Sequence, residues 1–251
     1  MTTYMPHWSV SDMHEPSSDD YSDVAVVMIT RNEERAIGKV VRDVLNELPG
    51  CRVYVIDGST DSTPERARSA GAVVIDEPGG GFGPALNAAL ATPTAPIIAT
   101  LDADDTYPVD MFPYMIHKVR SGVEVMGGSR LSWTGTSHMP LSNWLANLGF
   151  NVIASVTARR RVRDVHSGMR VYQRHVVHSF NWRYDGMAFP VDLLLYPMLG
   201  GFRVEEIFID YHERIGDSKL RKWPSAKATL KRLVSARGLS KAATIPPRTG
   251  I

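Results

Sequence analysis

The sequence has little cysteine and no long hydrophobic run, and both absences restrict what the protein can be. Of its 251 residues only Cys51 is a cysteine, which excludes an internal disulfide and fits a reducing compartment. No apolar run reaches the roughly 18 residues that a membrane-spanning helix needs, and the nearest, residues 146–158, is interrupted. The acidic first segment lacks the basic and apolar regions of a signal peptide. We therefore expect a cytoplasmic protein that does not cross the membrane.

An excess of one charge is also missing, because 28 Lys and Arg residues face 27 Asp and Glu residues. This balance argues against nucleic acid as a partner. The distribution is uneven, since no acidic residue follows Asp217 while many basic residues do. We expect a flexible polar arm over residues 1–23, one folded domain over 24–222 and a basic tail over 223–251. The tail would suit the anionic inner face of a membrane, although a solvated tail explains it equally well.

Short apolar runs alternate with amphipathic stretches in the first half of the chain. The expected strands cover residues 24–29, 53–56, 73–75 and 96–101, and the expected helices cover residues 37–48, 63–70 and 84–90. This alternation is typical of an α/β fold with a Rossmann-like, mostly parallel sheet flanked by helices. The second half is less regular and predicts a mixed arrangement. Its expected elements are strands at 123–126 and 204–211 and a long helix at 141–157.

Polar and acidic residues follow three of the expected strands. The three segments are Thr30-Arg31-Asn32-Glu33, Asp57-Gly58-Ser59-Thr60-Asp61 and Asp102-Ala103-Asp104-Asp105. Ligands of an open parallel sheet bind beyond the carboxyl ends of its strands, so these segments should line one cleft. In an extended chain the carboxylates of Asp102 and Asp104 would face one side and could share Mg²⁺ or Mn²⁺. Such an ion would keep positions open for substrate phosphates, although acidic residues after a strand also form turns and helix caps.

Other nucleotide and metal sites lack their sequence signatures here. The glycines of residues 79–83 follow the third expected strand and lack the G-x-G-x-x-G spacing of a dinucleotide dehydrogenase. The sequence has no P-loop, no zinc-site spacing and no G-x-S-x-G elbow. A diphosphate site with a divalent metal is therefore the expectation that we keep.

Six ordered motifs within residues 24–222 resemble family 2 glycosyltransferases, and among them the polyprenyl (dolichyl) phosphate sugar synthases. They are Thr30-Arg31-Asn32-Glu33-Glu34, Asp57-Gly58-Ser59-Thr60-Asp61-Ser62-Thr63, Leu101-Asp102-Ala103-Asp104, Gly128-Ser129-Arg130, Asp164-Val165-His166-Ser167-Gly168-Met169-Arg170 and Arg214-Ile215-Gly216-Asp217-Ser218-Lys219-Leu220. The last two distinguish the polyprenyl-phosphate group best. The resemblance implies a GT-A fold and a nucleotide-sugar donor.

The resemblance also implies roles for particular residues. The positions implied for donor binding are Thr30, Asn32, Glu33, Asp57, Ser59, Asp102, Ser167 and Ser218. The positions implied for the reaction are Asp104, Arg130, Asp164, Arg170, Arg214 and Lys219, and Asp102 with Asp104 would bind the metal. Arg214 and Lys219 would add positive charge to the leaving diphosphate. Arg130 and Arg170, with Ser167, are candidates for the acceptor phosphate.

The implied reaction is inverting transfer of a hexose from a donor of the GDP-mannose or UDP-glucose type to a polyprenyl phosphate. A phosphate monoester has a second pKa of about 6 and is largely ionised at neutral pH, so it needs no strong general base. One alternative is a soluble transferase that acts on a small-molecule hydroxyl, which would need Asp164 or Asp192 as a base. A second is a nucleotide-sugar-binding protein without catalysis. Peripheral membrane contact and a homo-oligomer are both compatible with the sequence.

For several of these residues a structural role is the alternative to a role in catalysis or binding. Asp164 can pair with Arg163 or Arg170, and His166 is more often structural than catalytic in such a position. Glu206 is expected to support the strand that leads to Arg214. Most of the helix expected at 141–157 should pack in the core. The departures from the resembled group are His138-Met139-Pro140, Asp105-Thr106-Tyr107 and Phe208, and they leave the donor and the acceptor less defined than the reaction class.

Overall fold

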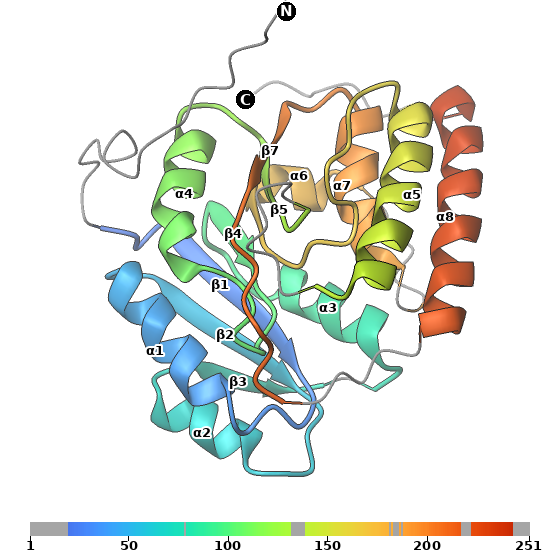
Figure 1. Cartoon of the computed structure of the whole chain (residues 1–251). Helices are drawn as coiled ribbons and strands as arrows, with labels where there is room; N and C mark the ends of the chain where they lie inside the picture. Colours follow the sequence, from blue (N-terminus) through green and yellow to red (C-terminus); the bar gives the residue numbers. More distant parts are fainter. Residues whose placement is uncertain are drawn as a thin grey trace, which may run out of the picture.

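A mixed seven-stranded sheet forms the centre of the protein, with the order β3-β2-β1-β4-β6-β5-β7 (Figure 1). The computed structural model describes residues 20–77, 79–131, 139–180, 182, 186, 188–216 and 222–242. The strands are β1 Val24–Thr30, β2 Arg52–Asp57, β3 Val73–Asp76, β4 Ile97–Thr100, β5 Val125–Ser129, β6 Arg170–Gln173 and β7 Val204–Phe208. The helices are α1 Ile37–Glu47, α2 Thr63–Ser69, α3 Phe82–Ala91, the short η2 Val109–Met111, α4 Phe112–Arg120, α5 Leu141–Ala158, α6 Arg174–His178, α7 Phe189–Leu199 and α8 Lys222–Ala242. The predicted α/β architecture with a mixed second half is confirmed.

Helices cover both faces of the sheet, and each face has its own core cluster (Figure 1). Alternate side chains of a strand point to opposite faces, so Val26 and Met28 of β1 join the cluster under α1, α2 and α4. Val27 joins the other cluster, under α3, α5, α7 and α8. Burial of a strand on both faces explains why β1 is a continuous apolar run.

The strand directions bring distant motifs to one edge of the sheet. β1, β2, β3 and β4 are parallel, so the loops that follow β1, β2 and β4 leave at the same edge. β6 runs antiparallel to β4 and β5, with Arg170 opposite Thr100 and opposite Gly127. The loop before β6 therefore arrives beside the end of β4. The sequence predicted no strand at β6, and this insertion is what carries the Asp164 motif to the acidic cleft.

The segment expected as a basic tail contains helix α8, which packs against α5 and α7 (Figure 1). Leu233 and Ala236 of α8 are buried in the second core cluster. The Arg232 Nε lies 3.3 Å from Asp192 Oδ2, and Asp192 is fully buried in the first turn of α7. At the other end of the chain, Tyr21 is already buried, so packing begins before residue 24. Among the described residues, no helix has the length and hydropathy to cross a membrane.

Helix α5 does not pack as the sequence predicted. We expected most of it in the core, but its buried residues are small or polar, namely Asn151, Ala154, Thr157 and Ala158. Several of its large apolar residues are exposed, with 70% of Leu141, 55% of Leu145 and 62% of Val156 accessible to solvent, whereas Phe150 and Ile153 pack partly buried against the second core cluster. The apolar period was correctly identified, but periodicity cannot say which face of a helix meets the protein.

Candidate active site

The loops after β1 and β2 form one side of the candidate site and are joined by hydrogen bonds. The Thr30 hydroxyl donates to Asp57 Oδ1 at 2.6 Å, and the Ser59 hydroxyl donates to the same oxygen at 2.6 Å. The Asn32 amide donates to Ser59 Oγ at 2.7 Å, and Asn32 Oδ1 accepts from the Thr60 amide at 2.8 Å. Asn32 has a φ of 56°, a left-handed conformation that asparagine tolerates better than most residues. The sequence-predicted nucleoside residues thus come together at the strand ends.

Arg214 connects this wall to the acidic loop after β4. Its Nη2 lies 3.0 Å from Glu33 Oε1, and its Nη1 lies 3.1 Å from Asp104 Oδ2. Asp104 is buried, and its Oδ1 accepts a hydrogen bond from the Thr106 hydroxyl at 2.6 Å. Three sequence-predicted residues from distant segments therefore meet in one ionic cluster, in which the guanidinium compensates two carboxylates.

Asp102 and Asp104 form the carboxylate pair of the cleft. Burial, followed by the negative charge of Asp104, raises the pKa of Asp102 to about 6. The hydroxyl of Tyr107 donates to Asp102 and accepts from the Gly168 amide at 2.8 Å. Two oxygen-donor carboxylates fit a hard dication such as Mg²⁺ or Mn²⁺. Within the described part of the chain no group of three or more potential ligands gathers, so an ion held here would keep positions for water and phosphates.

Gly168 allows the loop before β6 to pass against Asp102. A Cβ atom at this glycine would lie 2.5 Å from both carboxylate oxygens of Asp102, a contact that real side chains do not make. The Thr100 hydroxyl donates to the Gly168 carbonyl at 2.7 Å and fixes the approach. Gly168 was expected only as part of a motif, and neither Gly168 nor Tyr107 had a predicted role. Only the antiparallel pairing of β4 with β6 reveals the contact.

The buried carboxylate of Asp164 forms an ion pair with Arg130. The Nε and Nη2 atoms of Arg130 donate to Asp164 at 2.7 and 2.9 Å, and the Arg130 amide donates at 3.1 Å. Burial alone would raise the pKa of Asp164, but the Arg130 charge and these hydrogen bonds hold it below the usual value. The prediction that Asp164 could pair with Arg163 or Arg170 was wrong. Arg163 stacks over the Phe208 ring at 4.7 Å instead.

Glu206 and His166 hold the loop that carries Asp164. The Glu206 carboxylate accepts from the amides of Arg163 and Asp164 at 2.8 and 2.9 Å, so it supports this loop and not the strand leading to Arg214. His166 donates its amide to Asp164 Oδ1 at 3.1 Å, and its Nε2 lies 2.8 Å from the Thr229 hydroxyl of α8. These contacts join the cleft to the helix layer.

Arg170, Ser167 and Asp192 do not reach the cleft surface. Arg170 is only 2% exposed, and its guanidinium donates to the carbonyls of Pro190 and Val165 at 2.6 and 2.8 Å. Ser167 is equally buried and accepts from the Met169 amide. Asp192, which the sequence allowed as a cap or a site carboxylate, is the buried partner of Arg232. The predicted residues Ser218 and Lys219 lie outside the described residues.

The burial of His166 predicts how stability depends on pH. Burial lowers the pKa of His166 to about 4, against 6.5 in an unfolded chain. Between these values the unfolded chain binds the proton more readily, so stability should fall as pH drops from about 6.5 to about 4, by on the order of 3 kcal/mol. Urea unfolding at intervals across this range should show a shallower fall for His166→Gln than for the wild type. Equal slopes for the two proteins would contradict the assignment.

The sheet order, with carboxylates gathered beyond β1, β2 and β4, defines a GT-A fold. The chain belongs to glycosyl transferase family 2, whose family model matches residues 25–180. It is 37% identical over 215 residues to a dolichyl-phosphate hexose transferase of Haloferax volcanii, covering 85% of this chain and 93% of that protein. The low-salt glycan biosynthesis hexosyltransferase Agl6 of the same organism is 34% identical, over 86% of this chain and 56% of its own length. The protein is therefore a glycosyltransferase, as the motif resemblance predicted.

Solved structures agree on the fold. The crystal structure of glucosyl-3-phosphoglycerate synthase from Mycobacterium tuberculosis, in complex with Mn²⁺, UDP and phosphoglyceric acid, matches with a TM-score of 0.72. The match covers 94% of this chain and 85% of that chain at 20% identity, so it concerns the fold alone.

Proposed function

We propose that the protein transfers a hexose from a nucleoside diphosphate sugar to a polyprenyl phosphate, with inversion at the anomeric carbon. The observation that carries the proposal is the Arg130–Asp164 pair. A carboxylate held by a bidentate guanidinium and by a main-chain amide is a poor proton acceptor, so it does not suit activation of a hydroxyl. A phosphate acceptor is already ionised and needs no such base. The name of the Haloferax volcanii relative supports the same class of acceptor.

The donor half of the proposal rests on the cluster around Asp104. Asp102 and Asp104 would hold Mg²⁺ or Mn²⁺, which supplies Lewis-acid stabilisation of the diphosphate as it leaves. Arg214, already positioned by Glu33 and Asp104, adds a second positive charge beside that leaving group. Thr30, Asn32, Asp57 and Ser59 would hold the nucleoside. The intact carboxylate and arginine cluster argues against a protein that only binds nucleotide sugars.

In the transfer, a phosphate oxygen of the acceptor forms the new bond to the anomeric carbon. The bond from that carbon to the diphosphate oxygen breaks, and the electron pair leaves with the nucleoside diphosphate. A single displacement from the opposite face converts an α-linked donor into a β-linked product. Arg130, whose charge Asp164 compensates, would offer hydrogen bonds to the acceptor phosphate, whereas Arg170 holds the Val165 and Pro190 carbonyls beneath the site.

A comparison of two acceptors tests the phosphate preference. With whichever of GDP-mannose and UDP-glucose serves as donor, a short polyprenyl phosphate should be glycosylated, whereas the matching polyprenol should give less than about a hundredth of that rate. Nuclear magnetic resonance of the product should show a β-linked sugar. Glycosylation of the polyprenol, or of a soluble hydroxyl compound in preference to the phosphate, would favour the hydroxyl-acceptor alternative.

An apolar surface on α5 and α8 supports lipid access at a membrane face. The exposed residues of this surface are Leu141, Leu145, Leu148, Val152 and Val156 of α5, with Leu230 and Val234 of α8. The two helices lie side by side (Figure 1). Lys227 and Lys231 are exposed at helical spacing with Leu230 and Val234. Apolar side chains bordered by lysines fit an anionic lipid surface better than a second copy of this chain.

The apolar surface predicts binding to anionic vesicles. Leu145→Glu with Val152→Glu should reduce cosedimentation with phosphatidylglycerol-containing vesicles at least about tenfold, because two exposed apolar groups become charged. The matched control is Val73→Glu, at a half-exposed valine on β3, which should bind as the wild type. A stable dimer by light scattering, abolished by the double variant and accompanied by no vesicle binding, would contradict the membrane assignment.

A further inference from the structure

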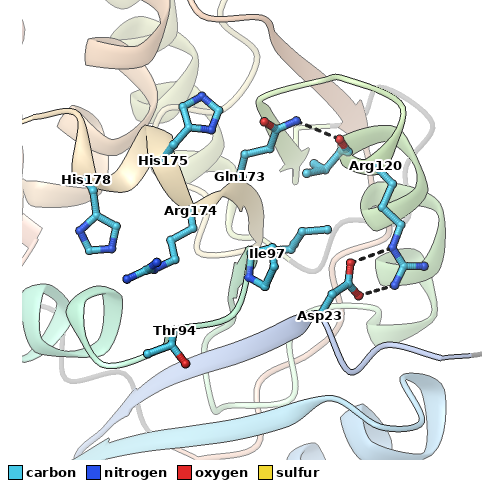
Figure 2. A pocket seen from close by; sticks show the side chains of 10 residues that line it. Asp23, Thr94, Ile97, Arg120, Gln173, Arg174, His175 and His178 are labelled. Carbon is cyan, nitrogen blue, oxygen red and sulfur yellow. Dashed lines mark hydrogen bonds and ion pairs between the residues drawn. The ribbon is translucent and has the colours of Figure 1, made fainter. Parts of the chain in front are cut away.

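A hollow lies at the opposite edge of the sheet from the carboxylate pair Asp102 and Asp104 (Figure 2). Its volume is about 730 Å³, and Ile97, the first residue of β4, forms part of its wall. Asp102 follows the other end of the same strand. The hollow therefore cannot belong to the donor site, and neither the proposed reaction nor its acceptor uses it.

The walls of this hollow are fixed by hydrogen bonds between elements. The Arg174 amide donates to the Pro96 carbonyl at 2.7 Å, joining the end of β6 to the start of β4. The Gln173 side-chain amide donates to the carbonyls of Val119 and Val123 at 3.1 and 3.2 Å. The shape of the hollow thus follows from the sheet and from α4, and it does not depend on a surface loop alone.

The charges around the hollow leave one cation uncompensated. Arg120 forms hydrogen bonds to Asp23 through both Nε and Nη2, so these two charges cancel (Figure 2). His175 lies 3.3 Å from Glu124. Among the described residues, no side-chain partner is found for the guanidinium of Arg174, and its Nε is buried without a hydrogen bond. A buried N–H donor without an acceptor is unfavourable, and an oxygen atom of a ligand would satisfy it.

The neighbours of Arg174 indicate the chemistry of that ligand. Figure 2 shows the guanidinium of Arg174 between the side chains of His178 and Thr94, and all three residues line the hollow. A planar guanidinium with further polar groups beside it matches the tetrahedral oxygens of a phosphate group. Ile97 and Val119 also line the hollow and are themselves almost fully buried, so its floor is apolar. The volume lies in the range of small-metabolite sites.

We propose that this hollow binds a small organic phosphate ester, with Arg174 as its anchor and His178 and Thr94 as supporting donors. The site is separate from the sugar-transfer cleft and does not depend on the proposed reaction. Inorganic phosphate shares the anchoring group but lacks the carbon skeleton. It should therefore bind more weakly than the ester.

Calorimetric titration of the full chain in the absence of metal, with glycerol 3-phosphate and inorganic phosphate as probes, tests the site. Arg174→Ala should weaken glycerol 3-phosphate binding at least about tenfold. Arg174→Lys should weaken it less, because the positive charge remains although the bidentate guanidinium geometry is lost. Arg68→Ala, at an exposed arginine of α2, and Arg214→Ala, in the other cleft, should each leave the affinity within about twofold.

Three results would overturn the proposal in different ways. Unchanged binding in Arg174→Ala would exclude the hollow as the site. Loss of binding in Arg214→Ala alone would assign the anion to the carboxylate cleft. Equal affinity for the two probes would reduce the site to one for the phosphate group without an organic part.

Discussion

Asp104→Asn should lower the turnover number roughly 10²–10³-fold. The amide retains an oxygen that can accept from the Thr106 hydroxyl, so the local fold should persist. It removes the negative charge that faces Arg214 at 3.1 Å and that would hold the divalent metal. Steady-state assays with saturating donor should show the loss in turnover, and higher Mn²⁺ should restore only a part of it.

The matched control for this variant is the neighbouring carboxylate. Asp105→Asn makes the same chemical change one residue away, where the side chain pairs with Lys39 at 2.7 Å. Asp105 has a φ of 63°, a conformation that asparagine adopts readily, so the control adds no backbone strain. Turnover of Asp105→Asn should stay within about threefold of the wild type, because the Asp105 carboxylate pairs with the half-exposed Lys39 and not with Arg214. Equal losses in the two variants would contradict a special role for Asp104.

Asp164→Asn should lower the free energy of unfolding by about 3–5 kcal/mol, because it leaves the Arg130 guanidinium buried without its counter-charge. The asparagine has nearly the same volume and keeps one acceptor oxygen, so the effect reports the charge. Urea unfolding at neutral pH measures it. The matched control is Asp43→Asn, whose exposed pair with Lys39 should contribute less than about 1 kcal/mol.

The same variant separates the two acceptor classes. If Asp164 were a general base for a hydroxyl acceptor, Asp164→Asn would abolish turnover while the free energy of unfolding stayed near that of the wild type. If Asp164 is the structural partner of Arg130, the free energy of unfolding should fall, and the molecules that remain folded should retain turnover. A conserved unfolding midpoint with no turnover would therefore contradict the structural role of the Arg130–Asp164 pair.

The first half of the fold could be predicted from the sequence because its elements are locally consistent. Val24 to Ile29 form an apolar run bounded by polar residues, and Ile37 to Val44 repeat at helical spacing, as found in β1 and α1. In the second half, α5, β5 and β7 were expected close to where they lie, but β6, α6, α7 and α8 were not. α7 is apolar on every side because it is buried all round, and α8 is largely polar, so neither shows a clear period.

The candidate site was predictable where a motif follows a strand directly. Thr30, Asp57 and Asp104 lie where strand ends of a parallel sheet must meet. The direction of the Arg170 side chain was not predictable. A motif identifies the residue type at a position, but it does not show whether the guanidinium points to the site or into the core. The partnership of Arg130 with Asp164 likewise depends on β6 entering antiparallel between β4 and β5. Pairings across 34 residues need the sheet register, which the sequence alone did not supply.

Transfer of radiolabelled sugar into a butanol-extractable lipid tests the central claim most directly. The assay supplies GDP-mannose or UDP-glucose with a polyprenyl phosphate, with and without Mn²⁺, beside Asp104→Asn as the control. We predict metal-dependent label in the lipid fraction from one of the donors and its loss in the control. Donor turnover that leaves the lipid fraction unlabelled, with the sugar on a water-soluble acceptor, would contradict the account.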